Sequence, residues 1–204
     1  MKVFLYCYPI QEYFTEGVVG ISLRNCQRQG YDINRLNEII DHRYRRQGYM
    51  IYWLFFSIEA DREQPDRITQ SPYIVIDQHD KVMASGVSFQ AHTTQDLYPD
   101  SDKLITRLCQ DRNPEQLVLG GFHQWDCVDR LAARAFARGL LTTVDEDTTE
   151  LFFSQTSLLG PIPLNRSREE FGAMLIADYH NQSELEILEI MRQHRRSRPW
   201  LVQL

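Results

Sequence analysis

The chain has 204 residues, of which 43% are hydrophobic and 25% charged, and it carries a formal net charge of -6. This composition is that of an ordinary globular protein, and the length suits one domain. The acidic balance offers no basic surface for nucleic acid, and no segment approaches the roughly 20 apolar residues of a membrane span. The N-terminal apolar run is too short for a signal peptide, so we expect a cytoplasmic protein with no membrane or nucleic-acid partner.

The first third of the chain predicts two strands separated by a helix. Residues 2–8 form a short apolar and aromatic run that ends before Pro9, which cannot donate to a sheet, so we expect a strand. Apolar positions at helical spacing predict a helix over 33–46, with Gly48 just after its end. Residues 49–56 are apolar on both faces and predict a buried strand.

The middle of the chain has the weakest pattern. Residues 57–71 carry many charges and predict an exposed loop. Residues 73–77 and 81–89 fit either a hairpin or a single strand with an excursion, and the pattern leaves both open. Residues 100–110 place their leucine and isoleucine side chains on one stripe and predict a helix.

A strand, a helix and another strand are predicted next, over the clearest part of the sequence. Residues 116–122 are a buried apolar run, and the apolar positions of 128–136 then recur at helical spacing, with Gly139 as the C-cap. Residues 140–147 form a further strand that ends in three acids, Asp145, Glu146 and Asp147. Because consecutive strand residues point to opposite faces and no histidine accompanies them, we interpret these acids as solvated or helix-capping groups, not metal ligands.

Two helices are expected to close the chain. Capping-box spacing occurs at Ser167 with Glu170 and at Ser183 with Glu186. The second of these helices has an apolar face made by Leu185, Leu188 and Met191. The whole pattern predicts one α/β domain over residues 1–204, with a mainly parallel open sheet, helices on both faces in three Rossmann-like layers, and a C-terminal helical extension over 160–204.

Cys127 lies where a buried strand gives way to a helix. Open α/β sheets bind ligands at this place, and a helix N-terminus stabilises a thiolate, whereas the charge of Asp126 opposes it. The chain has four cysteines and no CxxC, so we expect free thiols without a zinc site or a disulfide framework. If the first and fourth strands are neighbours, Cys7 and Tyr8 meet Cys127. The predicted substrate pocket comprises Cys7, Tyr8, Phe122, Trp125 and Asp126.

The segment Gly121-Phe-His-Gln-Trp-Asp-Cys127-Val128 resembles the strand-to-helix turn of the isochorismatase-like cysteine hydrolases. The resemblance continues for about thirty residues through AARAFARG and the acids that follow. VFLYCYPIQEYF resembles that family's first strand, and RLNEIIDHRYRRQGYMIYWLFF resembles its first helix and second strand. Together these regions cover about half of the chain. The resemblance implies an isochorismatase-like fold, hydrolase chemistry and a homo-oligomer. The sequence has no Gly-rich phosphate loop and no metal-ligand spacing, so we expect no cofactor or metal.

The resemblance implies three catalytic groups: a cysteine nucleophile, an aspartate base at the end of the first strand, and a lysine in the middle of the chain. Backbone amides in the loop before the cysteine stabilise the oxyanion. Cys127 falls on the nucleophile position. Aligning Gln11 with the family's glutamine puts Pro9 on the aspartate position, and a proline cannot be a base. Lys81 precedes Ser88 and Phe89, which resemble the segment after the family's lysine, but the spacing differs by about two residues.

The missing aspartate leaves two functions open. In the first, the protein is a divergent hydrolase in which Cys127 attacks an amide-like C–N bond of a small molecule, or a vinyl ether, and another residue is the base. The candidate bases are His123, Glu12, Asp77 and His92. In the second, the protein is a catalytically degenerate member that acts as a binding or oligomeric scaffold protein. Thiol redox chemistry between Cys7 and Cys127 is a third possibility.

Overall fold

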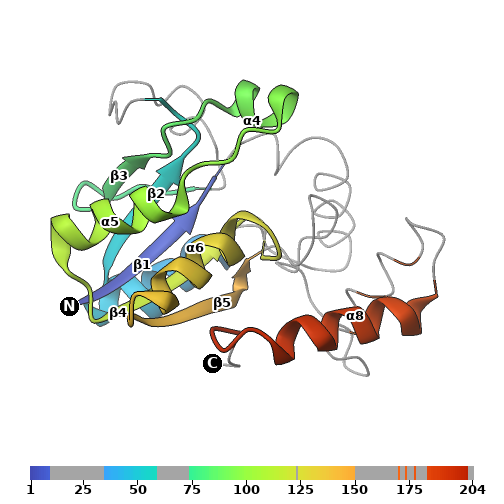
Figure 1. The fold of residues 1–204 in the computed structure, drawn as a ribbon. Coiled ribbons are helices and arrows are strands. Elements are labelled where there is room, and N and C mark those ends of the chain that lie inside the picture. The colour runs from blue at the N-terminus through green and yellow to red at the C-terminus, as the bar shows by residue number, and fades with distance from the viewer. Residues whose placement is uncertain are drawn as a thin grey trace.

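The computed structural model describes residues 1–9, 35–58, 74–122, 124–149 and 183–201, together with Glu170, Ala173 and Ala177. Within this part of the chain, five strands form one sheet in the order β3-β2-β1-β4-β5 (Figure 1). All the pairings are parallel, which confirms the predicted mainly parallel sheet. The strands are β1 (Lys2–Cys7), β2 (Met50–Phe55), β3 (Lys81–Ala84), β4 (Gln116–Gly121) and β5 (Leu141–Thr149).

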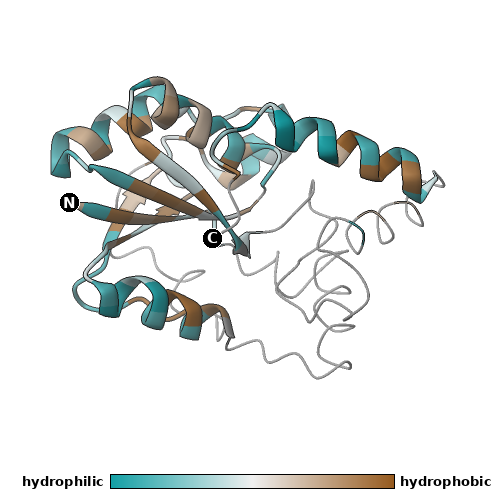
Figure 2. Cartoon of the chain, turned by 90° about the horizontal axis from the view of Figure 1, so that it is seen from below, coloured by the Kyte–Doolittle hydropathy of each residue, from teal (hydrophilic) through white to brown (hydrophobic). Residues whose placement is uncertain are grey.

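Helices lie on both faces of this sheet, as Figure 2 shows, so the predicted three-layer architecture is confirmed. The residues of β1 alternate between the two faces because successive strand side chains point in opposite directions. Leu5 and Cys7 pack with α5 and α6, whereas Phe4 and Tyr6 pack with α3 and η1. The helical elements are α3 (Arg35–Ile39), the π-helical turn η1 (Ile40–Tyr44), the 3-10 turn η2 (Arg45–Gln47), α4 (Phe89–Gln95), α5 (Ser101–Arg112), α6 (Cys127–Ala137) and α8 (Glu184–Arg196).

The middle of the chain forms no hairpin in its described residues. β3 is a single strand that pairs in parallel with β2, and residues 74–80 before it contain no strand. The short helix α4 was not predicted; it begins after Ser88, whose hydroxyl accepts a hydrogen bond from the amide of Ala91 at 3.2 Å. The predicted loop over 57–71 lies almost wholly outside the described residues, as do Ser167 of the first capping box and about half of the predicted extension over 160–204.

Two apolar side chains that the sequence placed on buried stripes are exposed. Phe136 is 46% exposed at the last turn of α6, where its ring packs on Trp200 at a centroid distance of 5.7 Å. Leu185 is 75% exposed because α8 turns its other side, with Ile187, Leu188 and Met191, to the interior. Within the part of the chain that the structure describes, no helix is both long enough and apolar enough to cross a membrane.

The interpretation of the β5 acids as solvated or capping groups was wrong for Asp145 and Glu146. Asp145 is buried, and both of its carboxylate oxygens accept hydrogen bonds from Arg43 at 2.9 Å, while the Tyr44 hydroxyl donates to one of them. Burial, followed by the negative charge of Asp145, raises the pKa of Tyr44. Glu146 accepts from Arg195 at 2.7 and 2.9 Å and thereby ties α8 to the sheet. The side chain of Asp147 lies outside what the structure describes.

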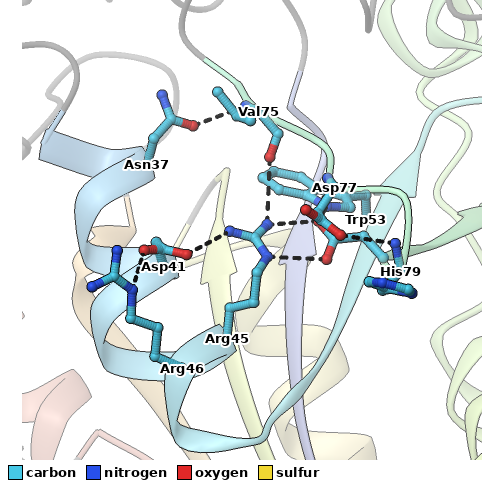
Figure 3. Close-up of polar contacts among 9 residues, drawn as sticks. Asn37, Asp41, Arg45, Arg46, Trp53, Val75, Asp77 and His79 are labelled. Atoms are coloured by element: carbon cyan, nitrogen blue, oxygen red, sulfur yellow. Dashed lines mark hydrogen bonds and ion pairs between the residues drawn. The ribbon is translucent and has the colours of Figure 1, made fainter.

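A second buried carboxylate, that of Asp80, stabilises the amino end of β3. Figure 3 shows Arg45, Trp53 and Asp77, which contact it. The Asp80 carboxylate accepts hydrogen bonds from Arg45 at 2.7 and 3.3 Å, from the indole of Trp53 at 2.9 Å and from the amide of Asp77 at 3.0 Å. Arg45 also contacts Asp41 at 3.5 Å. These contacts join η2, β2 and the segment before β3, at the end of the sheet opposite to Cys127.

Candidate active site

The carboxyl ends of the strands meet in one row across the sheet. Cys7 of β1 is paired with Leu54 of β2 and with Gly121 of β4, and Leu54 is paired with Met83 of β3. We call Met83, Leu54, Cys7 and Gly121 the carboxyl-end row. The chain runs outward from β1 through β2 to β3 and then crosses to β4 on the other side of β1. This reversal marks the place where open α/β sheets bind ligands.

Tyr8 has an unusual backbone conformation at the end of β1. Its φ of 59° lies in the left-handed region, which a bulky side chain rarely adopts. The conformation is held in place because the Tyr8 amide donates to the Leu54 carbonyl at 2.7 Å and the ring stacks on Phe56 at 4.1 Å. Such outliers concentrate at functional sites. Pro9, which is buried, follows directly. None of the three residues at this strand end, Cys7, Tyr8 and Pro9, carries a carboxylate.

Gly121 lets β4 turn sharply beside β1. Its φ is +107°, and a Cβ there would overlap the backbone oxygen of Cys7. The same Cys7 oxygen accepts a hydrogen bond from the amide of Phe122 at 3.0 Å. The turn from β4 therefore follows β1 closely before it reaches Cys127, the first residue of α6.

Cys127 lies next to a carboxylate and an arginine. Its side chain is 5% exposed, and the thiol donates a weak hydrogen bond to Asp126 Oδ2 at an Sγ–O distance of 3.9 Å. The other oxygen of Asp126 accepts from Arg130 Nε at 3.0 Å. The Arg130 guanidinium lies over the ring of Tyr98 at 4.1 Å from its centroid. Cys127, Asp126, Arg130 and Tyr98 form a contiguous group, which we call the Cys127 cluster.

The environment of Cys127 favours the protonated thiol at rest. Burial, followed by the negative charge of Asp126, raises the pKa of Cys127 above its ordinary value, and Arg130 opposes this effect. Burial, followed by the proximity of Cys127, also raises the pKa of Cys7. Cys7, Tyr8 and Cys127 belong to one buried cluster, so the structure brings the predicted nucleophile together with two of the predicted pocket residues. Each described cysteine is a free thiol.

The start of α6 presents amide groups with no partner inside the helix. The amide of Arg130 makes the first helical hydrogen bond, to the Asp126 carbonyl at 2.9 Å, so the amides of Cys127, Val128 and Asp129 have no helical acceptor. Asp126 occupies the N-cap position, but its side chain makes no capping hydrogen bond. These amides and the positive end of the helix dipole can stabilise negative charge that develops beside Cys127.

Aromatic rings extend from the end of β1 to the Cys127 cluster. Tyr8 stacks on Phe56, Phe56 stacks on His92 at 4.6 Å, and His92 meets Tyr98 edge-on at 5.0 Å. His92, a candidate base, uses Nδ1 to donate to the Leu97 carbonyl at 2.8 Å. Its described contacts are with these rings and not with Cys127.

Other predicted site residues lie apart from Cys127. Phe122 packs on the opposite face of the sheet, where its ring meets Tyr6 edge-on at 6.5 Å. The ring of Trp125 lies against α8, at 4.2 Å from His194. Lys81 begins β3 opposite Tyr52, two residues before Met83 and about 6.6 Å along the strand from the carboxyl-end row. These three side chains do not take part in the Cys127 cluster.

Of the three remaining candidate bases, the structure describes only Asp77. Glu12 and His123 lie outside the described residues. Asp77 belongs to the Asp80 network at the other end of the sheet, where Figure 3 shows it. The sequence reasoning missed Arg130 and Tyr98. Arg130 follows Asp126 by four positions, a spacing typical of ion pairs on a helix and a usable signal, whereas no sequence pattern connects Tyr98 to Cys127.

The described residues do not fit a metal site. Across the ranges that the structure describes, no three His, Cys, Asp or Glu side chains come together in a way that could hold an ion.

Comparison with known proteins supports the fold. No protein-family model matches the chain, and no curated protein matches it by sequence. Among solved structures, the pyrazinamidase of Pyrococcus horikoshii, in complex with zinc, is 13% identical, with a TM-score of 0.51 over 100% of this chain and 99% of that one. A putative hydrolase of the isochorismatase family from Chromobacterium violaceum is 14% identical over 94% of both chains, with a TM-score of 0.46. N-carbamoylsarcosine amidase from Thermoplasma acidophilum is 16% identical over 74% of this chain and 84% of that one, with a TM-score of 0.45.

Proposed function

We propose that this chain, which has the isochorismatase-like fold, is a hydrolase in which Cys127 attacks the carbonyl carbon of an amide-like C–N bond in a small molecule. The observation that carries the proposal is the position of Cys127. It is the first residue of α6 and lies beside amides that have no helical acceptor. It is at the carboxyl end of the sheet, between the strands where the strand order reverses. A nucleophile next to donors that can stabilise an oxyanion is the arrangement that acyl transfer requires.

The surroundings of Cys127 favour an uncharged substrate with an aromatic or apolar acyl group. The carboxyl-end row offers Met83, Leu54 and Cys7, none of which carries a charge at neutral pH. The aromatic rings that run from Tyr8 to Tyr98 pack on one another and make this side of the Cys127 cluster apolar, which suits an aromatic or apolar acyl group. The chemistry expected from these residues is hydrolysis of a small aromatic amide to a carboxylic acid and ammonia.

The test is ammonia release from a panel of aromatic and aliphatic primary amides. Cys127→Ala is the decisive variant, and Cys109→Ala, on the half-buried side of α5, is the matched control. We expect turnover of aromatic amides by the unchanged chain and by Cys109→Ala, together with its loss in Cys127→Ala. Turnover that survives in Cys127→Ala would contradict the proposal.

A second candidate is a non-catalytic binding or scaffold protein of the same fold. The observation that favours it is the absence of a carboxylate from the end of β1 and of an amine from the carboxyl-end row, among the residues described there. In this case neither the unchanged chain nor Cys127→Ala turns over any amide. Aromatic acids or amides would nevertheless raise the melting temperature, because a ligand that binds only the folded state stabilises it.

Three further expectations remain predictions. Assembly as a homo-oligomer is tested by light scattering at micromolar concentration, where a monomer alone would count against it. A cytoplasmic location is tested by cell fractionation. Redox pairing of Cys7 with Cys127, which lie in one buried cluster, is tested by non-reducing peptide mapping after mild oxidation with peroxide.

A further inference from the structure

We propose that Asp126 is the catalytic base and acid that serves Cys127, in place of a carboxylate at the end of β1; this inference rests on the proposed hydrolase function. Asp126 touches the reacting sulfur, with Oδ2 at 3.9 Å from Cys127 Sγ. Catalytic hydrogen bonds are often long in the absence of substrate and tighten in the complex, so this separation is compatible with proton transfer.

The position of the Asp126 carboxylate is set by two contacts, one for each oxygen. Oδ1 accepts from Arg130 Nε at 3.0 Å, whereas Oδ2 faces the thiol. An aspartate at the start of a helix usually caps the first amides, but the side chain of Asp126 makes no such bond. It is directed at Cys127 and Arg130, and the amides stay available for the oxyanion.

Arg130 is the positioning residue for this carboxylate. Its guanidinium lies over the Tyr98 ring at 4.1 Å while Nε donates to Asp126. The side chain of Asp126 is only 15% exposed, so its orientation is constrained by packing as well as by this ion pair. Since Arg130 contacts one oxygen alone, the other keeps its lone pairs for the proton of Cys127.

The other titratable groups that face Cys127 are poor bases. They are Cys7 from β1 and Tyr98 from the segment before α5. Burial raises the pKa of both groups, with further contributions from Cys127 at Cys7 and from Asp126 at Tyr98, so both hold their protons at neutral pH. Arg130 has no basic lone pair. Among the described residues around Cys127, Asp126 is therefore the group that can accept a proton.

The reaction balances with Asp126 as the only proton carrier. Cys127 Sγ forms a bond to the substrate carbonyl carbon while its proton passes to Asp126 Oδ2. The C–N bond then breaks as Asp126 returns this proton to the leaving nitrogen, which gives ammonia and a thioester on Cys127. Water attacks the thioester carbon, its proton passes through Asp126 to the departing sulfur, and the carboxylic acid and free thiol are released.

Two readouts on Asp126→Asn test the inference because they move in opposite directions. Asp126 raises the pKa of Cys127, so its neutralisation shifts the pH profile of Cys127 alkylation by iodoacetamide towards lower pH. We expect about three- to tenfold faster alkylation near pH 8. The same variant loses its base, so we expect amide turnover to fall about 10²- to 10⁴-fold. Cys7 and Cys109 are internal controls, because unfolding would raise the alkylation of every thiol.

Asp96→Asn is the matched control variant. Asp96 is an exposed carboxylate near Tyr98 with φ 52°, a conformation that asparagine tolerates, so both alkylation and turnover should stay unchanged. Asp126→Glu, which keeps the carboxylate, should recover part of the turnover. Circular dichroism of each variant verifies folding.

Turnover within threefold of the unchanged chain in Asp126→Asn, with Cys127→Ala inactive, would overturn the role of Asp126 and leave the hydrolase proposal standing. Turnover that persists in Cys127→Ala, or the absence of turnover on every amide, would overturn both. A loss of turnover in Asp126→Asn that is accompanied by unchanged Cys127 alkylation would also refute the inference, because the carboxylate would then not act on the thiol.

Discussion

Removing the Asp80 carboxylate should destabilise the protein strongly, although Asp80 lies far from the candidate active site. Asp80→Ala deletes the acceptor for Trp53 Nε1 at 2.9 Å and for two nitrogens of Arg45 at 2.7 and 3.3 Å (Figure 3). Trp53 is fully buried, so its indole N–H has no access to water once the acceptor is gone. The variant therefore creates an unsatisfied donor and an ion without its buried partner.

The magnitude follows from these two losses. A buried donor left without an acceptor costs about 1–3 kcal/mol. Loss of one partner of a buried ion pair costs about 3–5 kcal/mol, but Arg45 is 23% exposed and keeps its contacts with Asp41 and the Val75 carbonyl, so the lower part of this range applies. Because the two losses overlap, we expect the free energy of unfolding to fall by about 4 kcal/mol. For a chain of this size the melting temperature should decrease by about 8–16 °C.

The assay is urea and thermal unfolding followed by circular dichroism, with Asp41→Ala as the control. Asp41 contacts the same Arg45 but is 32% exposed, so its loss should cost no more than about 1 kcal/mol. Asp80→Asn, which keeps one acceptor oxygen, should fall between the two. Equal unfolding free energies for Asp80→Ala and Asp41→Ala would refute the reasoning, because the burial of the Asp80 network would then contribute nothing.

Three more outcomes are expected. Gly121→Ala should lower the free energy of unfolding by more than about 3 kcal/mol, because its Cβ overlaps the backbone of β1. Gly48→Ala, at φ +77° in open space, should cost about 1 kcal/mol. Equal urea midpoints for the two variants would contradict this. Glu146→Gln should speed tryptic cleavage within α8, while Glu189→Gln, in an exposed pair, should leave cleavage unchanged. Burial, and then the neighbouring Arg198, lower the pKa of His194 in the folded protein. As the pH falls below about 6.5, the unfolded chain therefore binds a proton before the folded one does, and the free energy of unfolding decreases. His194→Gln should reduce this decrease in urea titrations between pH 7 and pH 5.

The sequence predicts the sheet and the position of Cys127 because both depend on local patterns. The buried runs over 2–8 and 116–122 have apolar residues on both faces, as central parallel strands require, and each became a strand. Helical periodicity that starts directly after the second run indicates where α6 begins, and the structure starts α6 at Cys127. These signals lie within a few residues of the feature that they predict.

The remaining features depend on contacts between distant segments or on single backbone angles. Asp145 is buried because Arg43, far away in sequence, reaches it. Phe122 was expected in the pocket because it is close to Cys127 in sequence, whereas alternation along β4 puts it with Val118 on the opposite face, where the structure has it. The contact between Asp126 and Cys127 depends on a side-chain orientation, so the sequence places Asp126 in the pocket and opposes its charge to a thiolate but does not predict the contact with the thiol.

The sheet order also determines when the protein can complete its folding during synthesis. β1 emerges early from the ribosome, but it is the central strand, and Lys2 at its start pairs with Gln116 of β4. Until β4 has been made, one side of β1 has no partner, and its apolar side chains are exposed together with an open strand edge. Such edges promote aggregation of nascent chains, so truncation before residue 116 should yield chaperone-bound or insoluble protein, whereas chains that include β4 and β5 close the edge of β1.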